Sequence, residues 1–244
     1  MKTILPPVLF EDDTLIAFDK PSGLLVAPDR WDKERENLMT VVHQRLNPEW
    51  FNVHRLDHDA SGVLLCAKGK DAVRYMCRVF NAGSITKDYI AIVQGGPIEA
   101  SGSIQLRLEP DFVLPGRMRV ARDGGGKAAE TRYEVAERWS GHSLLRLRLL
   151  TSRTHQLRVH LAASGWPVVA DPFYGGSPLR LSRLKPGYKF KEGKPEKPLM
   201  GRLALHAQRL HLAHPKTGEL LTIESPEPKD FRISIRYLRQ WAAA

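Results

Sequence analysis

The feature that most constrains this chain is an apolar run, Val63–Ala67, that directly follows a strongly polar segment, His54–Gly62. Five consecutive apolar residues bounded by polar ones are typical of a buried strand. The polar segment carries two carboxylates, two imidazoles and one guanidinium within its first six residues. An irregular segment anchored on a rigid strand is a common place for catalytic groups, although an exposed polar loop can have the same composition.

The remaining periodicity predicts strands and helices in irregular order. Strands are indicated at Val8–Phe10, Leu15–Phe18, Tyr89–Val93, Thr131–Val135 and Leu144–Leu150, with a hairpin from Leu203–Leu212 and Leu220–Ile223. Helices are indicated at 38–46 with Asn37 as the cap, at Asp71–Phe80, at Thr154–Ser164 and around Phe231, Ile235 and Leu238. Leu108–Ala129 is expected to be a mobile loop or a ragged hairpin. This order predicts an α+β fold with a mostly antiparallel mixed sheet and flanking helices.

Composition indicates one soluble domain. No break in composition divides residues 1–244, so a single domain is expected, and a monomer is the default state. No run approaches 18 apolar residues, which argues against a membrane span. The start lacks the apolar stretch of a secretory signal, and the two cysteines form no disulfide framework. We therefore expect a cytoplasmic protein.

Charge favours a polyanionic partner. The chain has 37 Lys and Arg against 27 Asp and Glu, a formal balance of +10, which suits RNA, DNA or an acidic membrane surface. Arg180–Arg202 supplies six of these net charges and contains three prolines and three glycines, so no regular element is expected there. This basic insertion either follows a phosphate backbone or is a solvated surface loop. Its candidate RNA contacts are Lys185, Lys189 and Lys191.

A second polar segment, Thr151–Leu161, begins at a strand end and enters a helix. Ser152 or Thr154 is placed to cap that helix. Arg158 follows in the first turns, beside Leu157, on a face that points to the core. An Arg near an apolar face is costly unless it pairs with a carboxylate. The alternative is an Arg whose stem covers the core while its guanidinium stays in water.

Metal chemistry is the first rival interpretation. The chain has nine histidines, of which His54 and His58 are four residues apart and His206, His211 and His214 cluster. This pattern makes a metal-dependent nuclease or hydrolase the second hypothesis. However, no His-Glu-x-x-His, Cys-x-x-Cys or tight set of acids is present, and Arg55 would repel a dication. No metal site is therefore expected.

Five segments in matching order resemble the RluA-type pseudouridine synthases. HRLDHDASGVLL at 54–65 resembles the family signature HRLDxxTSGLLL. The other four are VLFEDDTLIAFDKPSGLLVAP at 8–28, KDYIAIVQG at 87–95, TSRTHQLRVHLAASGWPVVADPFYG at 151–175 and LALHAQRLHLAHPKTGE at 203–219. The resemblance implies the pseudouridine synthase catalytic fold. The family's frequent N-terminal RNA-binding module of the S4 type is expected to be missing, because only about twenty residues precede the Lys20-Pro21-Ser22-Gly23 loop.

The resemblance also assigns roles to residues. Asp57 matches the catalytic aspartate, Tyr89 the tyrosine that lies against the target base, and Arg158 the arginine that pairs with the aspartate. Arg55 matches the arginine that enters the RNA stack where the base leaves. His54, Arg153 and His155 are further expected RNA contacts. Two departures, Ala60 for the usual Thr and Ser152 for the usual Gly, alter none of the carried-over groups.

The implied reaction isomerises uridine in RNA to pseudouridine and requires no redox cofactor. The uridine must be flipped out of its stack to reach a carboxylate. That carboxylate could add to the ribose carbon, add to the uracil ring, or abstract a ribose proton. The expected substrate is a ribosomal or transfer RNA stem-loop. A non-catalytic RNA-binding protein that keeps the fold is the third interpretation, and the presence of Asp57, Tyr89 and Arg158 argues against it.

Overall fold

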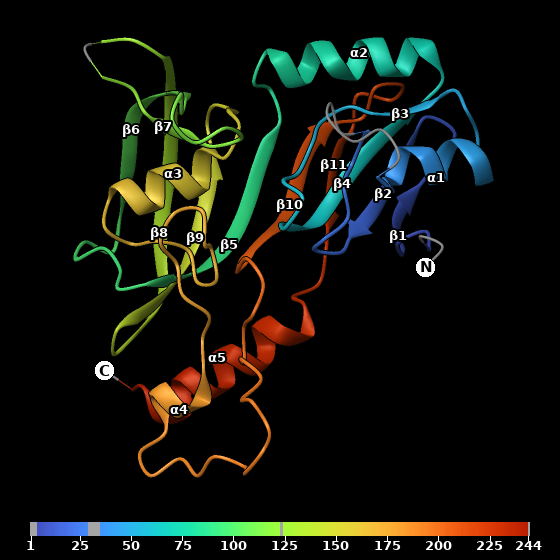
Figure 1. Ribbon diagram of the computed structural model, residues 1–244. Helices are drawn as coiled ribbons and strands as arrows, with labels where there is room; N and C mark the ends of the chain where they lie inside the picture. The colour runs from blue at the N-terminus through green and yellow to red at the C-terminus, as the bar shows by residue number, and fades with distance from the viewer. Residues whose placement is uncertain (1–3, 29–34, 123, 244) are drawn as a thin grey trace. The chain divides into compact units, whose positions relative to one another are not determined.

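The computed structural model describes residues 4–28, 35–122 and 124–243, which form two compact units (Figure 1). Unit 1 comprises the described residues up to Asp88 together with His206–Pro226. Unit 2 comprises Tyr89–Leu205 together with the described residues from Glu227 onward. Each unit therefore takes its residues from two separate stretches of the chain, and no single cut would separate them. The expectation of one domain over 1–244 stays a prediction.

Unit 1 is built on a mixed sheet. Its strands are β1 (Val8–Glu11), β2 (Leu15–Lys20), β3 (Trp50–Asn52), β4 (Ser61–Lys68), β10 (Leu205–Ala213) and β11 (Leu220–Glu224). Their order is β1-β2-β4-β10, with β11 beside β10 and β3 beside the far end of β4. The β4–β10 pair is parallel, whereas the β1–β2, β2–β4, β3–β4 and β10–β11 pairs are antiparallel. The predicted mostly antiparallel, mixed sheet is thus confirmed.

Strand β4 is buried from Ser61 to Ala67, and helices cover both of its faces. Val63 and Leu65 belong to a buried cluster that includes Met76 of helix α2 (Lys70–Asn81). Successive side chains of a strand point to opposite faces, so Cys66 points the other way. Its sulfur lies 3.9 Å from that of Met39. Met39 belongs to helix α1 (Leu38–Arg45), where the Asn37 side chain caps the helix by accepting from the backbone N–H of Thr40, as predicted.

Unit 2 contains a sheet that the sequence showed only in part. Its strands follow the order β5-β9-β8-β6-β7 and are β5 (Thr86–Gln94), β6 (Ser101–Pro110), β7 (Met118–Val120), β8 (Lys127–Trp139) and β9 (His142–Leu149). The β9–β8, β8–β6 and β6–β7 pairs are antiparallel. The first three residues of β5 belong to unit 1. The expected mobile loop or ragged hairpin over Leu108–Ala129 is a hairpin of β6 with the short β7.

Three helices belong to unit 2: α3 (Gln156–Ala163), α4 (Leu181–Leu184) and α5 (Lys229–Trp241). Helix α4 corrects the expectation that the basic insertion Arg180–Arg202 contains no regular element, because it fits ahead of the first proline, Pro186. Helix α3 packs Val159 against Leu108 and Ala129 of the sheet. No helix among the described residues is long and apolar enough to cross a membrane.

Gly62 permits the close approach of β4 to β10 in unit 1. It is paired with Ala207, and its φ of +115° lies where side chains are disfavoured. A Cβ added at Gly62 would lie 2.1 Å from the carbonyl oxygen of Ala207. A side chain at this position would therefore push the two strands apart at the end of the polar segment His54–Gly62.

Replacing Gly62 by Ala is expected to destabilise the protein by roughly 3 kcal/mol, through backbone strain and overpacking together. Urea-induced unfolding would measure the change. Gly83→Ala is the matched control, because Gly83 also has a positive φ, of +73°, but open space around it. Equal losses in the two variants would contradict the role assigned to close strand approach.

Candidate active site

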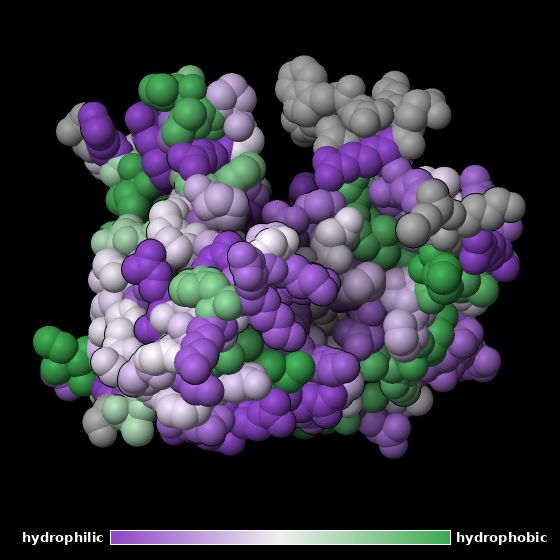
Figure 2. All heavy atoms as spheres, turned by 60° about the horizontal axis from the view of Figure 1, so that its bottom comes forward, coloured by the Kyte–Doolittle hydropathy of each residue, from purple (hydrophilic) through white to green (hydrophobic). Residues whose placement is uncertain are grey.

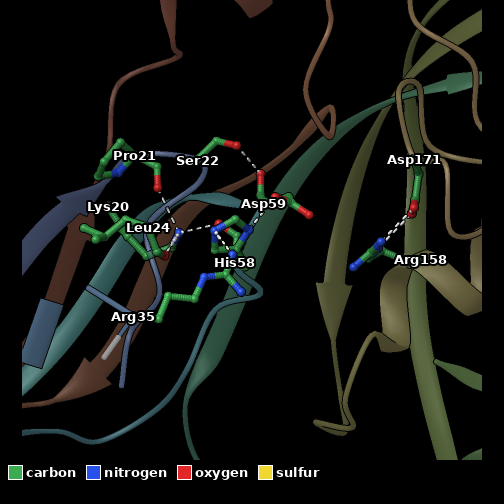
Figure 3. Close-up of polar contacts among 9 residues, drawn as sticks. All are labelled: Lys20, Pro21, Ser22, Leu24, Arg35, His58, Asp59, Arg158 and Asp171. Atoms are coloured by element: carbon green, nitrogen blue, oxygen red, sulfur yellow. Dashed lines mark hydrogen bonds and ion pairs between the residues drawn. The ribbon is translucent and has the colours of Figure 1, made fainter. Parts of the chain in front are cut away.

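The segment that carries Asp57 is an irregular loop held from below by a buried ammonium group. Lys20, at the end of β2, is fully buried. Its Nζ donates to the backbone carbonyls of Pro21 at 2.8 Å, Leu24 at 2.9 Å and His58 at 3.0 Å (Figure 3). A buried charge is tolerated only when it is fully hydrogen-bonded, and three carbonyl oxygens match the three donors of an ammonium. Lys20 therefore joins the Lys-Pro-Ser-Gly loop to the turn that follows Asp57.

Two more contacts fix the same turn. The Ser22 hydroxyl donates to the carbonyl of Asp59 at 2.6 Å, and the Gly23 N–H donates to the carbonyl of His58 at 2.9 Å. Within the turn, the Ala60 N–H donates to the Asp57 carbonyl at 3.2 Å. The backbone on both sides of the partly buried Asp57 is consequently held in one conformation.

The second aspartate of the loop, Asp59, is engaged at the surface. The Asp59 carboxylate lies 2.6 Å from Nδ1 of His58, and Nε2 of His58 lies 3.0 Å from the Arg35 guanidinium (Figure 3). Asp59 is half exposed and is engaged by this surface contact. The structure therefore places Asp59 in a His58–Arg35 network at the surface.

His54 has an internal role that the sequence did not predict. Its Nε2 accepts the N–H of Leu65 in β4 at 2.9 Å, and its ring stacks on Phe80 with 4.9 Å between centroids. Burial, and to a smaller degree the charge of Lys87, lower the pKa of His54 to about 3. The neutral imidazole thus anchors the start of the loop on the strand. The expected RNA contact of His54 stays a prediction.

A buried polar chain lies beneath the end of the loop. The Ser61 hydroxyl is 2.9 Å from Nδ1 of His206, and Nε2 of His206 is 3.2 Å from the hydroxyl of Ser225. Ser225 in turn donates to the Asp19 carboxylate at 2.8 Å. His206 thus belongs to a network of side chains from four segments. Of the other two histidines of the expected cluster, His211 contacts Asp88 and Thr222, and His214 contacts Asp12.

In unit 2, Arg158 is a buried charge that is held by a buried carboxylate. Its Nε and Nη2 each donate to one oxygen of the Asp171 carboxylate at 2.7 Å (Figure 3). The two side chains are 4% and 0% exposed. The alternative of a guanidinium that stays in water is therefore wrong, and the expected carboxylate partner exists. Asp171 was missed as that partner, although it lies in the DPFYG portion of a segment that resembles the family.

Aromatic rings complete the surroundings of Arg158. Its guanidinium carbon lies 5.3 Å from the ring centre of Phe173 and 5.0 Å from that of Tyr174, a distance at which cation–π attraction operates. The Tyr174 hydroxyl accepts the N–H of Met118 and lies 2.8 Å from Nδ1 of His155. Phe173 is nevertheless 45% exposed, so part of this aromatic wall faces solvent.

The start of helix α3 differs from the expectation. Neither Ser152 nor Thr154 caps it; the N-cap is His155, with a left-handed φ of 51° and no side-chain cap. The Gln156 side chain organises the loop instead. Its Oε1 accepts from the Arg153 N–H and the Thr151 hydroxyl, and its Nε2 donates to the Glu130 carbonyl. The exposed Arg153 side chain reaches the carbonyl of Ala128 at 3.2 Å.

The expected catalytic residues are divided between the two units. Asp57 belongs to unit 1, whereas Arg158 and the buried Tyr89, in β5, belong to unit 2. The expected pairing of Asp57 with Arg158 and the stacking role of Tyr89 stay predictions. Among the described residues, no group of three or more His, Cys, Asp or Glu is arranged to hold a metal ion.

Comparison with known sequences places this loop and helix in one family. The profile described as RNA pseudouridylate synthase matches residues 14–163, a range that includes Asp57, Tyr89 and Arg158. The dual-specificity RNA pseudouridine synthase RluA of Escherichia coli K12 is 36% identical over 221 residues, which are 90% of this chain and 92% of that protein. The ribosomal large subunit pseudouridine synthase D of Nitrosomonas europaea is 36% identical over 95% of this chain but only 65% of its own length.

Solved structures show the same fold. Human RNA pseudouridylate synthase domain containing 1 superposes with a TM-score of 0.69 and 27% identity, covering 92% of this chain and 84% of that one. Human RNA pseudouridylate synthase domain containing 4 gives a TM-score of 0.70 at 23% identity, over 95% and 92% of the two chains. The α+β architecture expected from the sequence is therefore shared with these two proteins.

The neutral state of His54 predicts a pH dependence of stability. The unfolded chain binds a proton at this ring near pH 6.5, whereas the folded protein does so only near pH 3. The contribution of the neutral His54 ring to the free energy of unfolding is thus fully present above pH 6.5. It is lost as the pH falls, by up to about 1.4 kcal/mol per pH unit. Urea unfolding of the wild type and of His54→Gln between pH 7 and pH 4.5 should show the difference in unfolding free energy shrinking. A constant difference would show that His54 titrates normally.

Because the Arg158–Asp171 pair is buried, we expect the loss of stability to be much larger for Asp171→Asn than for Asp71→Asn. Asp171→Asn leaves a buried guanidinium without its counter-charge and should cost about 3 kcal/mol of stability. Asp71→Asn is the control, because Asp71 is 97% exposed and pairs loosely with Arg74 at 3.6 Å. That change is expected to stay within about 0.5 kcal/mol. Similar unfolding midpoints for the two variants would contradict the burial of the Arg158 charge.

Proposed function

This chain belongs to the RNA pseudouridylate synthase family, and from that premise we propose that it converts uridine in RNA to pseudouridine with Asp57 as the catalytic carboxylate. The observation that carries the proposal is the Asp57 loop itself. Its backbone is fixed by Lys20, Ser22 and Gly23, and it is anchored on the buried strand β4. Catalytic groups need this kind of rigid support to keep a reactive geometry.

The reaction rearranges bonds without any change of oxidation state. The N1–C1′ bond of uridine breaks, the uracil turns, and a C5–C1′ bond forms. The proton lost from C5 is balanced by one gained at N1, so substrate and product have the same composition. The chain needs to supply an ionised carboxylate and a place to hold the freed base. Addition of Asp57 to the ribose or the base, and abstraction of a ribose proton, remain alternative first steps.

Arg158 is proposed as the counter-charge that keeps Asp57 ionised. A guanidinium stays protonated in any protein environment and would lower the pKa of an adjacent carboxyl. The bidentate contact with Asp171 supports this role because it holds Arg158 in one orientation before any substrate arrives. Asp171 then acts as a positioning residue, and the rings of Phe173 and Tyr174 shield the pair.

Base flipping requires side chains that replace the lost stacking. We propose that Arg55, which is exposed in the loop, enters the RNA stack, and that Tyr89 lies against the captured uracil. Arg153 and His155, at the start of α3, are proposed RNA contacts, as are Lys185, Lys189 and Lys191 of the basic insertion. Their positive charge or exposed position supports this assignment.

The proposed substrate is a stem-loop of ribosomal or transfer RNA. Support comes from the relative named as a dual-specificity RNA pseudouridine synthase, of which this chain covers 92%. The relative named for the ribosomal large subunit is covered over only 65% of its length, so it carries less weight for the substrate. A monomer acting in the cytoplasm remains the expectation from the sequence.

Asp57→Asn is expected to abolish pseudouridine formation, because an amide can neither act as a nucleophile nor accept the proton. RNA binding should change little, since the variant removes a negative charge and keeps the shape. Primer extension on carbodiimide-treated RNA would reveal the product. Asp59→Asn is the matched control: it alters the other acid of the loop, which contacts His58 at the surface, and it should retain most of the turnover.

Normal turnover by Asp57→Asn would disprove the assignment of the catalytic residue. Activity that disappears on exhaustive chelation and returns with zinc would instead favour the metal-dependent alternative. Wild-type protein that binds RNA but never yields a carbodiimide-dependent stop would favour a non-catalytic RNA-binding protein.

A further inference from the structure

We propose that unit 2 carries a second RNA-binding surface, which holds an unpaired stretch of RNA by stacking bases on Tyr188 and Phe190 and by placing phosphates against nearby lysines. We call it the basic platform, and it consists of Tyr188, Lys189, Phe190, Lys191 and Lys194, all within the insertion Arg180–Arg202. The inference rests on the proposed function only in taking RNA as the ligand. Beyond the proposed function, it specifies that the bound RNA is single-stranded and names the residues that contact it.

The insertion that carries the platform is held in a defined conformation by hydrogen bonds at its base. Its base is closed where the backbones of Leu179 and Met200 pair, with N–H to O distances of 3.0 and 3.3 Å. Glu196 adds a second closure by accepting from the Ser182 N–H at 2.9 Å and from its hydroxyl at 2.6 Å. A loop held at its base loses less conformational entropy on binding than a free one.

Both ends of helix α5 contact the insertion. The Arg202 guanidinium forms a bidentate pair with Asp230 in the first turn of the helix, at 2.6 and 2.8 Å. The Lys185 ammonium lies 5.2 Å from the ring centre of Trp241 in the last turn. Helix α5 adds the exposed cations Arg232 and Arg236. Figure 2 shows the face that carries this part of unit 2, where hydrophilic residues predominate.

The positive charge of the platform is not neutralised by the protein. Of the eight Lys and Arg in the insertion, only Arg202 forms an ion pair with a carboxylate among the described residues. Glu196, one of the two acids in the segment, is occupied by Ser182, whose hydrogen bonds lower the pKa of its carboxyl. Lys189, Lys191 and Lys194 therefore present net charge to solvent, as a phosphate-binding surface requires.

The aromatic pair distinguishes this surface from an ordinary solvated loop. Phe190 is 69% exposed, and its ring meets that of Tyr188 edge to face, with 5.1 Å between centroids. Because the Phe190 ring is exposed among lysines, it does not contribute to packing of the apolar core. Exposed aromatics interleaved with cations are what proteins use to bind single-stranded nucleic acid, because every unpaired base offers a face for stacking. A base inside a duplex is stacked on both faces by its neighbours, so duplex RNA is disfavoured as the occupant.

The test uses the full chain and an RNA that the catalytic site cannot process. The probe is a fluorescent single-stranded oligonucleotide of adenosine and cytidine, without uridine, and a G·C duplex of equal length is the comparison. The wild type should bind the single strand more tightly than the duplex. The variant Tyr188→Ala/Phe190→Ala should lose about 5-fold to 100-fold in affinity for the single strand, with an unchanged salt slope.

Neutralising charge should have the complementary effect. In Lys189→Gln/Lys191→Gln/Lys194→Gln, the slope of log affinity against log salt should fall by up to about 2, because each phosphate contact on a single strand contributes about 0.7. The control removes three exposed cations of unit 1, as Lys70→Gln/Arg74→Gln/Arg78→Gln. It carries the same change of net charge and should leave single-strand affinity and salt slope close to those of the wild type.

Three results would overturn the proposal: equal affinity of the wild type for duplex and single strand, equal losses in the control and platform variants, or binding of the platform only to vesicles of anionic lipid. Circular dichroism of each variant confirms that an observed loss is not unfolding.

Mapping of pseudouridine in cellular RNA treated with wild-type protein tests the proposed function separately. The binding assay and the pseudouridine map therefore distinguish a failure of the basic platform from a failure of the proposed function.

Discussion

The loop that carries Asp57 depends on one buried ammonium group. Moving a lysine charge out of water is costly, and the cost is offset here because the three donors of Lys20 each reach a backbone carbonyl. Two of those carbonyls belong to the loop that follows β2, and the third belongs to the turn after Asp57. A single side chain therefore sets the conformation of two loops that are more than thirty residues apart in sequence.

Unit 2 solves a similar problem with a buried pair of opposite charges. The guanidinium of Arg158 is satisfied by both oxygens of Asp171, a geometry that fixes direction as well as distance. The charged groups expected to act on substrate are in this way oriented before RNA binds. Pre-organised charge is more effective in catalysis than charge that must move during the reaction, since no reorganisation is needed at that moment.

Local patterns in the sequence predicted the elements whose cause is local. The apolar run Val63–Ala67 is a central strand, and Asn37 caps its helix through the nearby Thr40. The prediction failed where a distant group supplies the stabilisation. Helix α3 lacks a side-chain cap because Gln156 organises the preceding loop against β8, and the short helix α4 forms in a segment whose prolines and glycines argued against it.

The sequence by itself determined the family, the mixed α+β fold and the position of Asp57, because these depend on residue types at fixed spacing. Only the tertiary structure decided that Asp171 holds Arg158, that His54 is a neutral anchor, and that Ser61, His206, Ser225 and Asp19 form one buried network. Partners up to 206 residues apart meet only when strands from both ends of the chain lie in one sheet. Burial then changes the chemistry of each group, and no local pattern encodes it.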